Sequence, residues 1–144
     1  MITGRCLCGG VRFEVAATLG PVIYCHCSMC RRASGSAFAT NASVRTDGFR
    51  ITAGRELITE YESSPQQFRG FCSRCGSPLY GRQAAFPQMR RVRLGTLEGD
   101  PGTRSVAHIW VGSKSAWFEI TDELEQFDEE PPIEYCAPGR QGGL

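Results

Sequence analysis

Apolar and polar residues alternate over short stretches of the chain, which is the pattern of half-buried β-strands. Val11-Arg12-Phe13-Glu14-Val15 shows the alternation most clearly. Turn formers such as Gly20-Pro21 and Asp47-Gly48 separate these stretches. The same reasoning predicts further strands at residues 22–24, 38–44, 49–52, 57–61, 67–71, 92–94 and 106–111.

Only residues 28–33 have the character of a helix, and Gly35 favours its end. Many short strands at close spacing predict a mainly β fold, with short antiparallel strands folded into packed sheets and one short helix. The aromatic side chains of Trp110, Trp117 and Phe118 are expected in the core, and His108 is expected to be a buried or lining histidine.

The length of 144 residues suits one domain, which we expect at residues 1–130, with residues 131–144 as a C-terminal tail. A hydrophobic content of 41% and a charged content of 22% are ordinary for a globular protein. No apolar run is long enough to span a membrane. No apolar signal segment precedes Cys6, so a cytoplasmic location is expected.

The net charge of +1 is unevenly distributed. Residues 119–134 carry eight of the 15 acidic residues, whereas residues 1–118 carry 15 of the 16 basic residues, 14 of them arginines. Arginine binds carboxylates and phosphates through a rigid two-pronged fork, so one interpretation is an anionic small ligand; the other is solvated surface. Nucleic acid is not expected as a partner, because it calls for a stronger overall positive charge with interleaved aromatics.

Two pairs of cysteines have the spacing of metal-binding hooks. Cys6 and Cys8 form a CxC pair, and Cys72 and Cys75 form a CxxC pair followed by Gly76. Four thiolates from two hooks form a closed tetrahedral zinc site of the structural kind. Two disulfides or reduced core cysteines are the alternative, and clustered spacings in a reducing compartment favour metal.

A third group, Cys25, Cys27 and Cys30, offers three sulfurs within six residues. On an extended segment Cys25 and Cys27 point the same way, Cys30 returns one helical turn later, and His26 points away. Three ligands leave a fourth position for water or a substrate thiolate, as in catalytic zinc sites. Arg31 and Arg32 follow directly and would favour thiolates. A transient disulfide or a weak, often empty site are the alternatives.

Four ordered motifs resemble the glutathione-dependent formaldehyde-activating enzyme family, which includes the centromere protein V relatives. They are CxCGxV from Cys6, CHCxxCR with GSAF from Cys25, FCxxCGxxL from Phe71 and HIWVGSKxxW from His108. The resemblance implies a zinc-stapled β-tent fold. It implies structural Zn²⁺ on the first two cysteine pairs and a second, labile Zn²⁺ on Cys25, Cys27 and Cys30.

The resemblance also implies carbon–sulfur lyase-type chemistry at Cys25, Cys27 and Cys30, written as formation of S-(hydroxymethyl)glutathione from glutathione and formaldehyde. Glutathione, a small-molecule thiol, carries two carboxylates that Arg31, Arg32 or Arg69 are candidates to bind. A non-catalytic zinc-stapled binding module with the same fold is the alternative function. Cys136 belongs to neither hook and is expected to be incidental.

Overall fold

The computed structural model describes residues 1–135, and it is mainly β with one α-helix, as the sequence predicts. The strands are β1 (Ile2–Arg5), β2 (Arg12–Val15), β3 (Val22–Cys25), β4 (Ala39–Arg45), β5 (Phe49–Ala53), β6 (Ile58–Ser64), β7 (Gln67–Cys72), β8 (Pro78–Gln83), β9 (Met89–Arg93), β10 (Leu97–Glu98), β11 (Ser105–Ile109) and β12 (Glu125–Gln126). Helix α1 spans Ser28–Ser34. Single 3-10 turns lie at Thr46–Gly48, Arg55–Leu57, Leu94–Thr96, Val111–Ser113 and Ile133–Tyr135.

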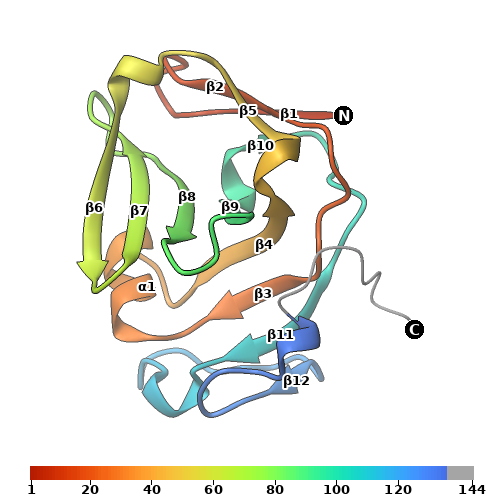
Figure 1. The fold of residues 1–144 in the computed structure, drawn as a ribbon. Helices are drawn as coiled ribbons and strands as arrows, with labels where there is room; N and C mark the ends of the chain where they lie inside the picture. Colours follow the sequence, from red (N-terminus) through yellow and green to blue (C-terminus); the bar gives the residue numbers. More distant parts are fainter. Residues whose placement is uncertain (136–144) are drawn as a thin grey trace.

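The strands form two sheets (Figure 1). The smaller has the order β10-β1-β2-β5, and the larger has the order β12-β11-β3-β4-β9-β8-β7-β6. In the view shown, β6 and β7 run nearly upright, whereas β3 and β11 lie across the lower part of the molecule. The larger sheet therefore turns strongly between its two ends, in keeping with the twist of long sheets.

The main core lies between the two sheets. Phe13 and Phe49 come from the smaller sheet and Leu79 and Val92 from the larger one, and all four side chains are buried. The rings of Phe13 and Phe49 lie 5.1 Å apart. A second, smaller cluster lies on the other face of the larger sheet, around Ile23 and its neighbours. Strand β3 serves both clusters because consecutive side chains of a strand point to opposite faces.

One glycine makes a close backbone approach possible within the smaller sheet. Gly54 has a φ of 71°, and a Cβ on it would lie 2.1 Å from the carbonyl oxygen of Gly10. Only glycine adopts this conformation without strain and leaves room for that oxygen. The turn after β5 therefore packs directly against the segment that follows Cys8.

Several details differ from the sequence-based expectation. Strands β1, β8, β10 and β12 were not among the predicted segments. Most pairings are antiparallel, but β11 pairs in parallel with both β3 and β12. Trp117 was expected in the core and is 74% exposed. It follows a 3-10 turn in an irregular connection, so no strand directs its side chain inward.

The described part of the expected tail lies against the domain. Pro131 is buried, and the ring of Tyr135 lies 5.1 Å from that of Phe127. Cys136 lies outside the described residues. Within residues 1–135, no helix has the length and apolar character needed to cross a membrane.

Truncating a core side chain between the sheets should destabilise the protein strongly. Leu79 is fully buried, so Leu79→Ala removes apolar contacts and leaves a cavity; we expect a loss of about 2–5 kcal/mol in the free energy of unfolding. Leu7→Ala is the matched control, because the Leu7 side chain is 85% exposed. Urea unfolding of both variants measures the difference, and equal losses would contradict the location of the core.

Candidate functional site

The four hook cysteines converge from the two sheets. Cys6 and Cys8 lie in the connection between β1 and β2, Cys72 ends β7, and Cys75 lies in the turn to β8. Their four sulfurs lie within 4.8 Å of one another. All four are free thiols, so the disulfide alternative is not what the structure shows.

The spacing of these four sulfurs suits a tetrahedral metal ion. Tetrahedral coordination with Zn–S bonds of about 2.3 Å puts sulfurs about 3.8 Å apart. The Sγ atoms of Cys6 and Cys8 are 3.5 Å apart, and those of Cys8 and Cys72 are 3.9 Å apart. The backbone N–H of Val11 donates to Cys6 Sγ at 3.2 Å. A hydrogen bond with Ser77 is the main cause that lowers the pKa of Cys75 to about 5, which favours the thiolate form of this one cysteine, the form that binds metal.

The inner group is built at the junction of β3 and α1. Cys25 ends β3, Cys27 is the N-cap of α1, and Cys30 lies in its first turn. The backbone N–H of Cys30 donates to Cys27 Sγ at 3.3 Å, which satisfies one of the free N–H groups at the start of the helix. Gly35 ends the helix with a φ of 62°. The three sulfurs lie within 4.8 Å of one another, as the sequence predicts.

Charge is divided unequally within this inner group. Hydrogen bonds with Cys25 and Cys27, and then the positive charge of Arg69, strongly lower the pKa of Cys30. The same contacts with Cys27 and Cys30, together with burial, strongly raise the pKa of Cys25. These opposite shifts favour the thiolate form of Cys30 over that of Cys25. The guanidinium Nη1 and Nη2 of Arg69 lie 3.7 and 3.9 Å from its sulfur.

A buried chain of hydrogen bonds lies behind the inner cysteines. His26 Nε2 is 2.7 Å from His108 Nδ1, and His108 Nε2 is 3.0 Å from Asp122 Oδ2. Both histidines are almost fully buried, and burial, followed by the charges of His108 and Lys114, lowers the pKa of His26 to about 4. His26 points away from the sulfurs, as expected, and ties the Cys25–Cys27 segment to β11. The partnership with Asp122 has no signal in the sequence, because 14 residues of irregular chain separate the two.

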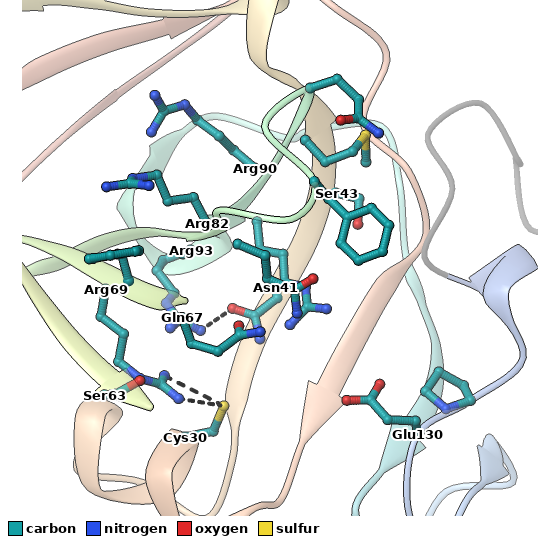
Figure 2. A pocket seen from close by; sticks show the side chains of 18 of the residues that line it. Cys30, Asn41, Ser43, Ser63, Gln67, Arg69, Arg82, Arg90, Arg93 and Glu130 are labelled. Atoms are coloured by element: carbon teal, nitrogen blue, oxygen red, sulfur yellow. Dashed lines mark hydrogen bonds between the residues drawn. The ribbon is translucent and has the colours of Figure 1, made fainter. Parts of the chain in front are cut away.

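Two cavities open onto the inner cluster. The first, of about 600 Å³, includes Cys30 in its lining, and the second, of about 370 Å³, includes all three inner cysteines. Both cavities share Cys30, Asn41, Arg69 and Glu130, so they adjoin at the sulfur of Cys30. Figure 2 shows Arg69 reaching across the first cavity to Cys30. These volumes are in the usual range for small-molecule sites.

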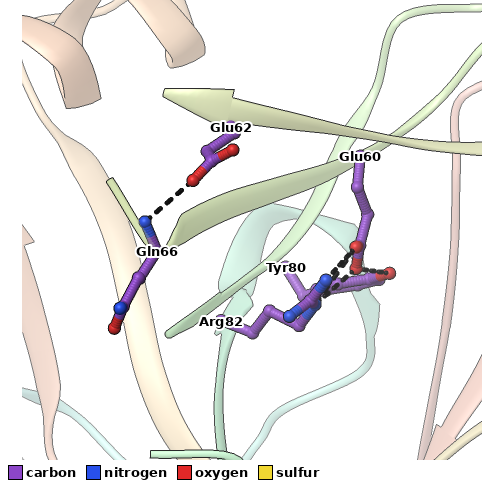
Figure 3. Close-up of polar contacts among 5 residues, drawn as sticks. All are labelled: Glu60, Glu62, Gln66, Tyr80 and Arg82. Atoms are coloured by element: carbon purple, nitrogen blue, oxygen red, sulfur yellow. Dashed lines mark hydrogen bonds and ion pairs between the residues drawn. The ribbon is translucent and has the colours of Figure 1, made fainter. Parts of the chain in front are cut away.

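Arginines dominate the charge of the first cavity. Its lining contains five arginines and one carboxylate, and the arginines are Arg69, Arg82, Arg90, Arg91 and Arg93. Arg82 is neutralised by an ion pair with Glu60, which also accepts a hydrogen bond from Tyr80 at 2.8 Å (Figure 3). Arg90 lies 4.7 Å from the centre of the Tyr80 ring. The remaining positive charge suits an anionic ligand.

The arginines expected from the sequence are placed differently from one another. Arg69 lines both cavities, whereas Arg31 and Arg32 line neither. The Nε of Arg31 donates to the carbonyl oxygen of His26 at 3.1 Å, so this side chain helps to fix the backbone between Cys25 and Cys27. Arg93 and Asn41, which sequence reasoning missed, lie in the first cavity as buried polar residues. Neither residue stands out in the sequence, because Arg93 belongs to the arginine-rich stretch Met89–Arg93 and Asn41 is an uncharged residue of Ala39–Arg45.

Fold and site together define a β-sheet protein with one closed four-cysteine cluster and one open three-cysteine cluster. A family model described as glutathione-dependent formaldehyde-activating enzyme matches residues 1–113. The chain therefore belongs to this family. The prediction made from the four motifs is confirmed.

Individual relatives agree with this assignment. A Halomonas elongata protein, provisionally named as a glutathione-dependent formaldehyde-activating enzyme, is 32% identical over 129 residues, which cover 83% of this chain and 81% of the relative. A Talaromyces marneffei protein of the same provisional name is 33% identical over 81 residues, covering 54% of this chain and 42% of its own length. A crystal structure of a Rhodobacter sphaeroides protein has a TM-score of 0.60 at 31% identity, covering 68% of this chain and 89% of that chain.

Breaking the four-cysteine cluster should unfold the protein. Cys75→Ser removes one of four thiolates that join the two sheets, and structural zinc contributes about 10–16 kcal/mol in small zinc peptides. We expect loss of cooperative thermal unfolding, measured by circular dichroism, and loss of bound metal, measured by atomic emission. Cys136→Ser controls for the change in cysteine count. A stable, well-folded, metal-free Cys75→Ser protein would contradict a structural site.

Breaking the inner cluster should leave the fold intact. Cys27 lies outside the four-cysteine cluster and is only partly buried, so Cys27→Ser should remove metal from the inner group alone. We expect an unchanged unfolding midpoint in circular dichroism and a metal content lower than that of the unmutated protein. If Cys27→Ser unfolds as Cys75→Ser does, the division into two kinds of site is wrong.

Proposed function

We propose that this protein is a carbon–sulfur lyase-type enzyme that forms S-(hydroxymethyl)glutathione from glutathione and formaldehyde. The observation that carries the proposal is the open inner cluster. Three sulfurs converge there, no fourth cysteine, histidine or carboxylate of residues 1–135 joins them, and a cavity of about 370 Å³ adjoins them. Membership of the family supports glutathione and formaldehyde as the reactants.

The residues present fit zinc in both clusters, because thiolates are preferred zinc ligands and the sulfurs have tetrahedral spacing. We assign a structural zinc to Cys6, Cys8, Cys72 and Cys75, and a labile one to Cys25, Cys27 and Cys30. When bound at the inner group, zinc supplies the acidity that deprotonates a thiol and polarises a carbonyl.

The chemical step balances without a further reactant. The thiolate sulfur forms a bond to the formaldehyde carbon, the carbonyl π electrons move to oxygen, and that oxygen takes up a proton. In the reverse direction the carbon–sulfur bond breaks, which is the lyase reaction. Arg69 lies beside Cys30 and provides positive charge where the oxygen becomes negative. Its role is to hold charge and orient the ligand.

The cationic cavity suits the two carboxylates of glutathione. Arg69 alone of the three arginines expected from sequence lines this cavity, so we assign ligand binding to it rather than to Arg31 or Arg32. Arginine holds a carboxylate through two parallel hydrogen bonds, which fixes orientation as well as adding affinity.

A non-catalytic binding module with the same fold is not favoured. Such a module would close the inner group off from any cavity or complete it with a fourth protein ligand. Cys25 and Cys30 are buried, but a cavity of about 370 Å³ includes all three cysteines in its lining, and none of residues 1–135 adds a fourth ligand. We place the protein in the cytoplasm, because clusters of free thiols are maintained in a reducing compartment.

The protein should accelerate exchange between free formaldehyde and its glutathione adduct. Exchange NMR with ¹³C-formaldehyde measures this rate against the uncatalysed reaction. The glutathione diester keeps the thiol but lacks both carboxylate charges, so we expect it to bind more weakly by about 1.5–3 kcal/mol for each charged hydrogen bond lost.

Cys27→Ser is the matched inactive variant, and it should return the exchange rate to the uncatalysed value. Equal acceleration by the variant would remove the inner cluster from the mechanism. No acceleration by the unmutated, zinc-loaded protein would refute the proposed activity. Equal use of glutathione and its diester would refute the carboxylate contacts while leaving the reaction itself in place.

A further inference from the structure

Arg93 is a buried cation without a carboxylate partner. It lies on β9, is 8% exposed, and donates from Nη1 to Asn41 Oδ1 on the neighbouring strand β4. Its Nε is buried and has no hydrogen-bond partner, and among residues 1–135 no carboxylate forms an ion pair with it. Burial is the main cause that lowers the pKa of Arg93, and the negative groups that oppose this effect are the sulfurs of Cys30 and Cys25, not a carboxylate. The unpaired Nε–H of this buried cation leaves one hydrogen bond to be made, and an anionic ligand can accept it.

A second guanidinium, that of Arg69, lies at the sulfur of Cys30. Arg69 is fixed by a hydrogen bond from its Nε to Ser63 Oγ at 2.9 Å, and both its terminal nitrogens face Cys30 Sγ. Figure 2 shows Arg93 joined to Asn41 and Arg69 joined to Cys30, and all four residues line the same cavity. Arg82, in the same cavity, forms an ion pair with Glu60, so its charge is already balanced by a carboxylate.

We propose that Arg93 and Arg69, with Asn41 holding Arg93 in place, form a carboxylate-binding subsite directly beside Cys30. Guanidinium groups bind carboxylates in bidentate fashion, and burial strengthens the interaction. Because the subsite adjoins the sulfur of Cys30, it takes a carboxylate of the same ligand whose thiol approaches the inner cluster. The inference deepens the proposed function, since it names small anionic thiols as the ligand class, but its test needs no turnover.

The alternative is that Arg93 only ties β9 to β4 through Asn41. The two residues lie opposite each other in the antiparallel register, so a purely structural bond between them is geometrically natural. A structural bond would not make the site discriminate between charged and neutral reagents of the same shape. The charge preference of a chemical probe therefore separates the two roles.

The test compares iodoacetate with iodoacetamide, which differ in charge and react with the same thiolates. Full-length protein is treated with a mild chelator that removes the labile inner metal and leaves the four-cysteine metal in place, which metal analysis and circular dichroism check. Peptide mapping by mass spectrometry then gives the alkylation rate at Cys30. Because both reagents react with the same thiolate, the ratio of the two rates does not depend on the fraction of Cys30 that is ionised. We expect Arg93→Gln to lower the iodoacetate-to-iodoacetamide ratio about tenfold, because charged hydrogen bonds of this kind contribute about 1.5–3 kcal/mol.

Two further variants keep the result decisive. Asn41→Asp keeps the size of the side chain and gives Arg93 a permanent carboxylate, so it should lower the ratio similarly while retaining the arginine. Arg55→Gln removes the same charge from an exposed residue that lines neither cavity, and it should leave the ratio unchanged. An unchanged ratio in Arg93→Gln and Asn41→Asp, or an equal fall in Arg55→Gln, would overturn the subsite.

A calorimetric titration extends the test to protein loaded with metal. Mercaptoacetate and mercaptoacetamide differ in the same charge, and we expect mercaptoacetate to bind about tenfold tighter to the unmutated protein and equally to Arg93→Gln. The alkylation ratio requires neither formaldehyde nor glutathione. If the protein does not accelerate exchange but the variants change the alkylation ratio as expected, the proposed function alone is refuted. If the protein accelerates exchange but the variants leave the alkylation ratio unchanged, the subsite alone is refuted.

Discussion

Four cysteine thiols from the two sheets converge at one point, and the relative placement of the sheets depends on the interaction that keeps these thiols together. The smaller sheet consists of strands of two to five residues, too short to be stable by themselves. Its β1–β2 connection carries Cys6 and Cys8, and the β7–β8 turn of the larger sheet carries the other two cysteines. Four thiolates at this spacing repel one another unless a cation lies between them. A metal ion bound there would turn that repulsion into attraction and fix the sheets on either side of the shared core.

The two clusters share a ligand type and differ in what surrounds them. Around the four-cysteine group the contacts are backbone N–H groups and the Ser77 hydroxyl, which are neutral. Around the inner group the charged contact is the guanidinium of Arg69 at Cys30, while the His26–His108 pair lies behind the cysteines and does not contact their sulfurs. The neutral surroundings of the four-cysteine group stabilise thiolates but offer no charge to bind a ligand. The surroundings of the inner group leave positive charge facing a cavity, so the same sulfur chemistry is joined to ligand binding.

The sequence predicted those features that depend on local spacing. Strand β2 alternates visibly, and the cysteine hooks lie within a few residues of each other, so both were found. Strand β8 was missed because it begins with Pro78 and contains Gly81, which weaken the strand pattern. The pairing of Arg93 with Asn41 depends on the register of β4 against β9, across 52 residues of chain. No local pattern encodes that register, so the contact between these two buried polar residues could not be predicted from the sequence.

Charge balance explains why the arginines and the open cluster occur together. Three thiolates around a divalent cation carry a net negative charge, and a fourth thiolate from a ligand increases it. A ligand with its own carboxylate would then be repelled from the site unless positive charge lay beside the sulfurs. Arg69 and Arg93 provide that charge at Cys30, whereas Arg82 is already neutralised by Glu60. A cavity of the same shape without these arginines would leave the negative charge of a metal-loaded cluster uncompensated, so an anionic ligand would be repelled from it.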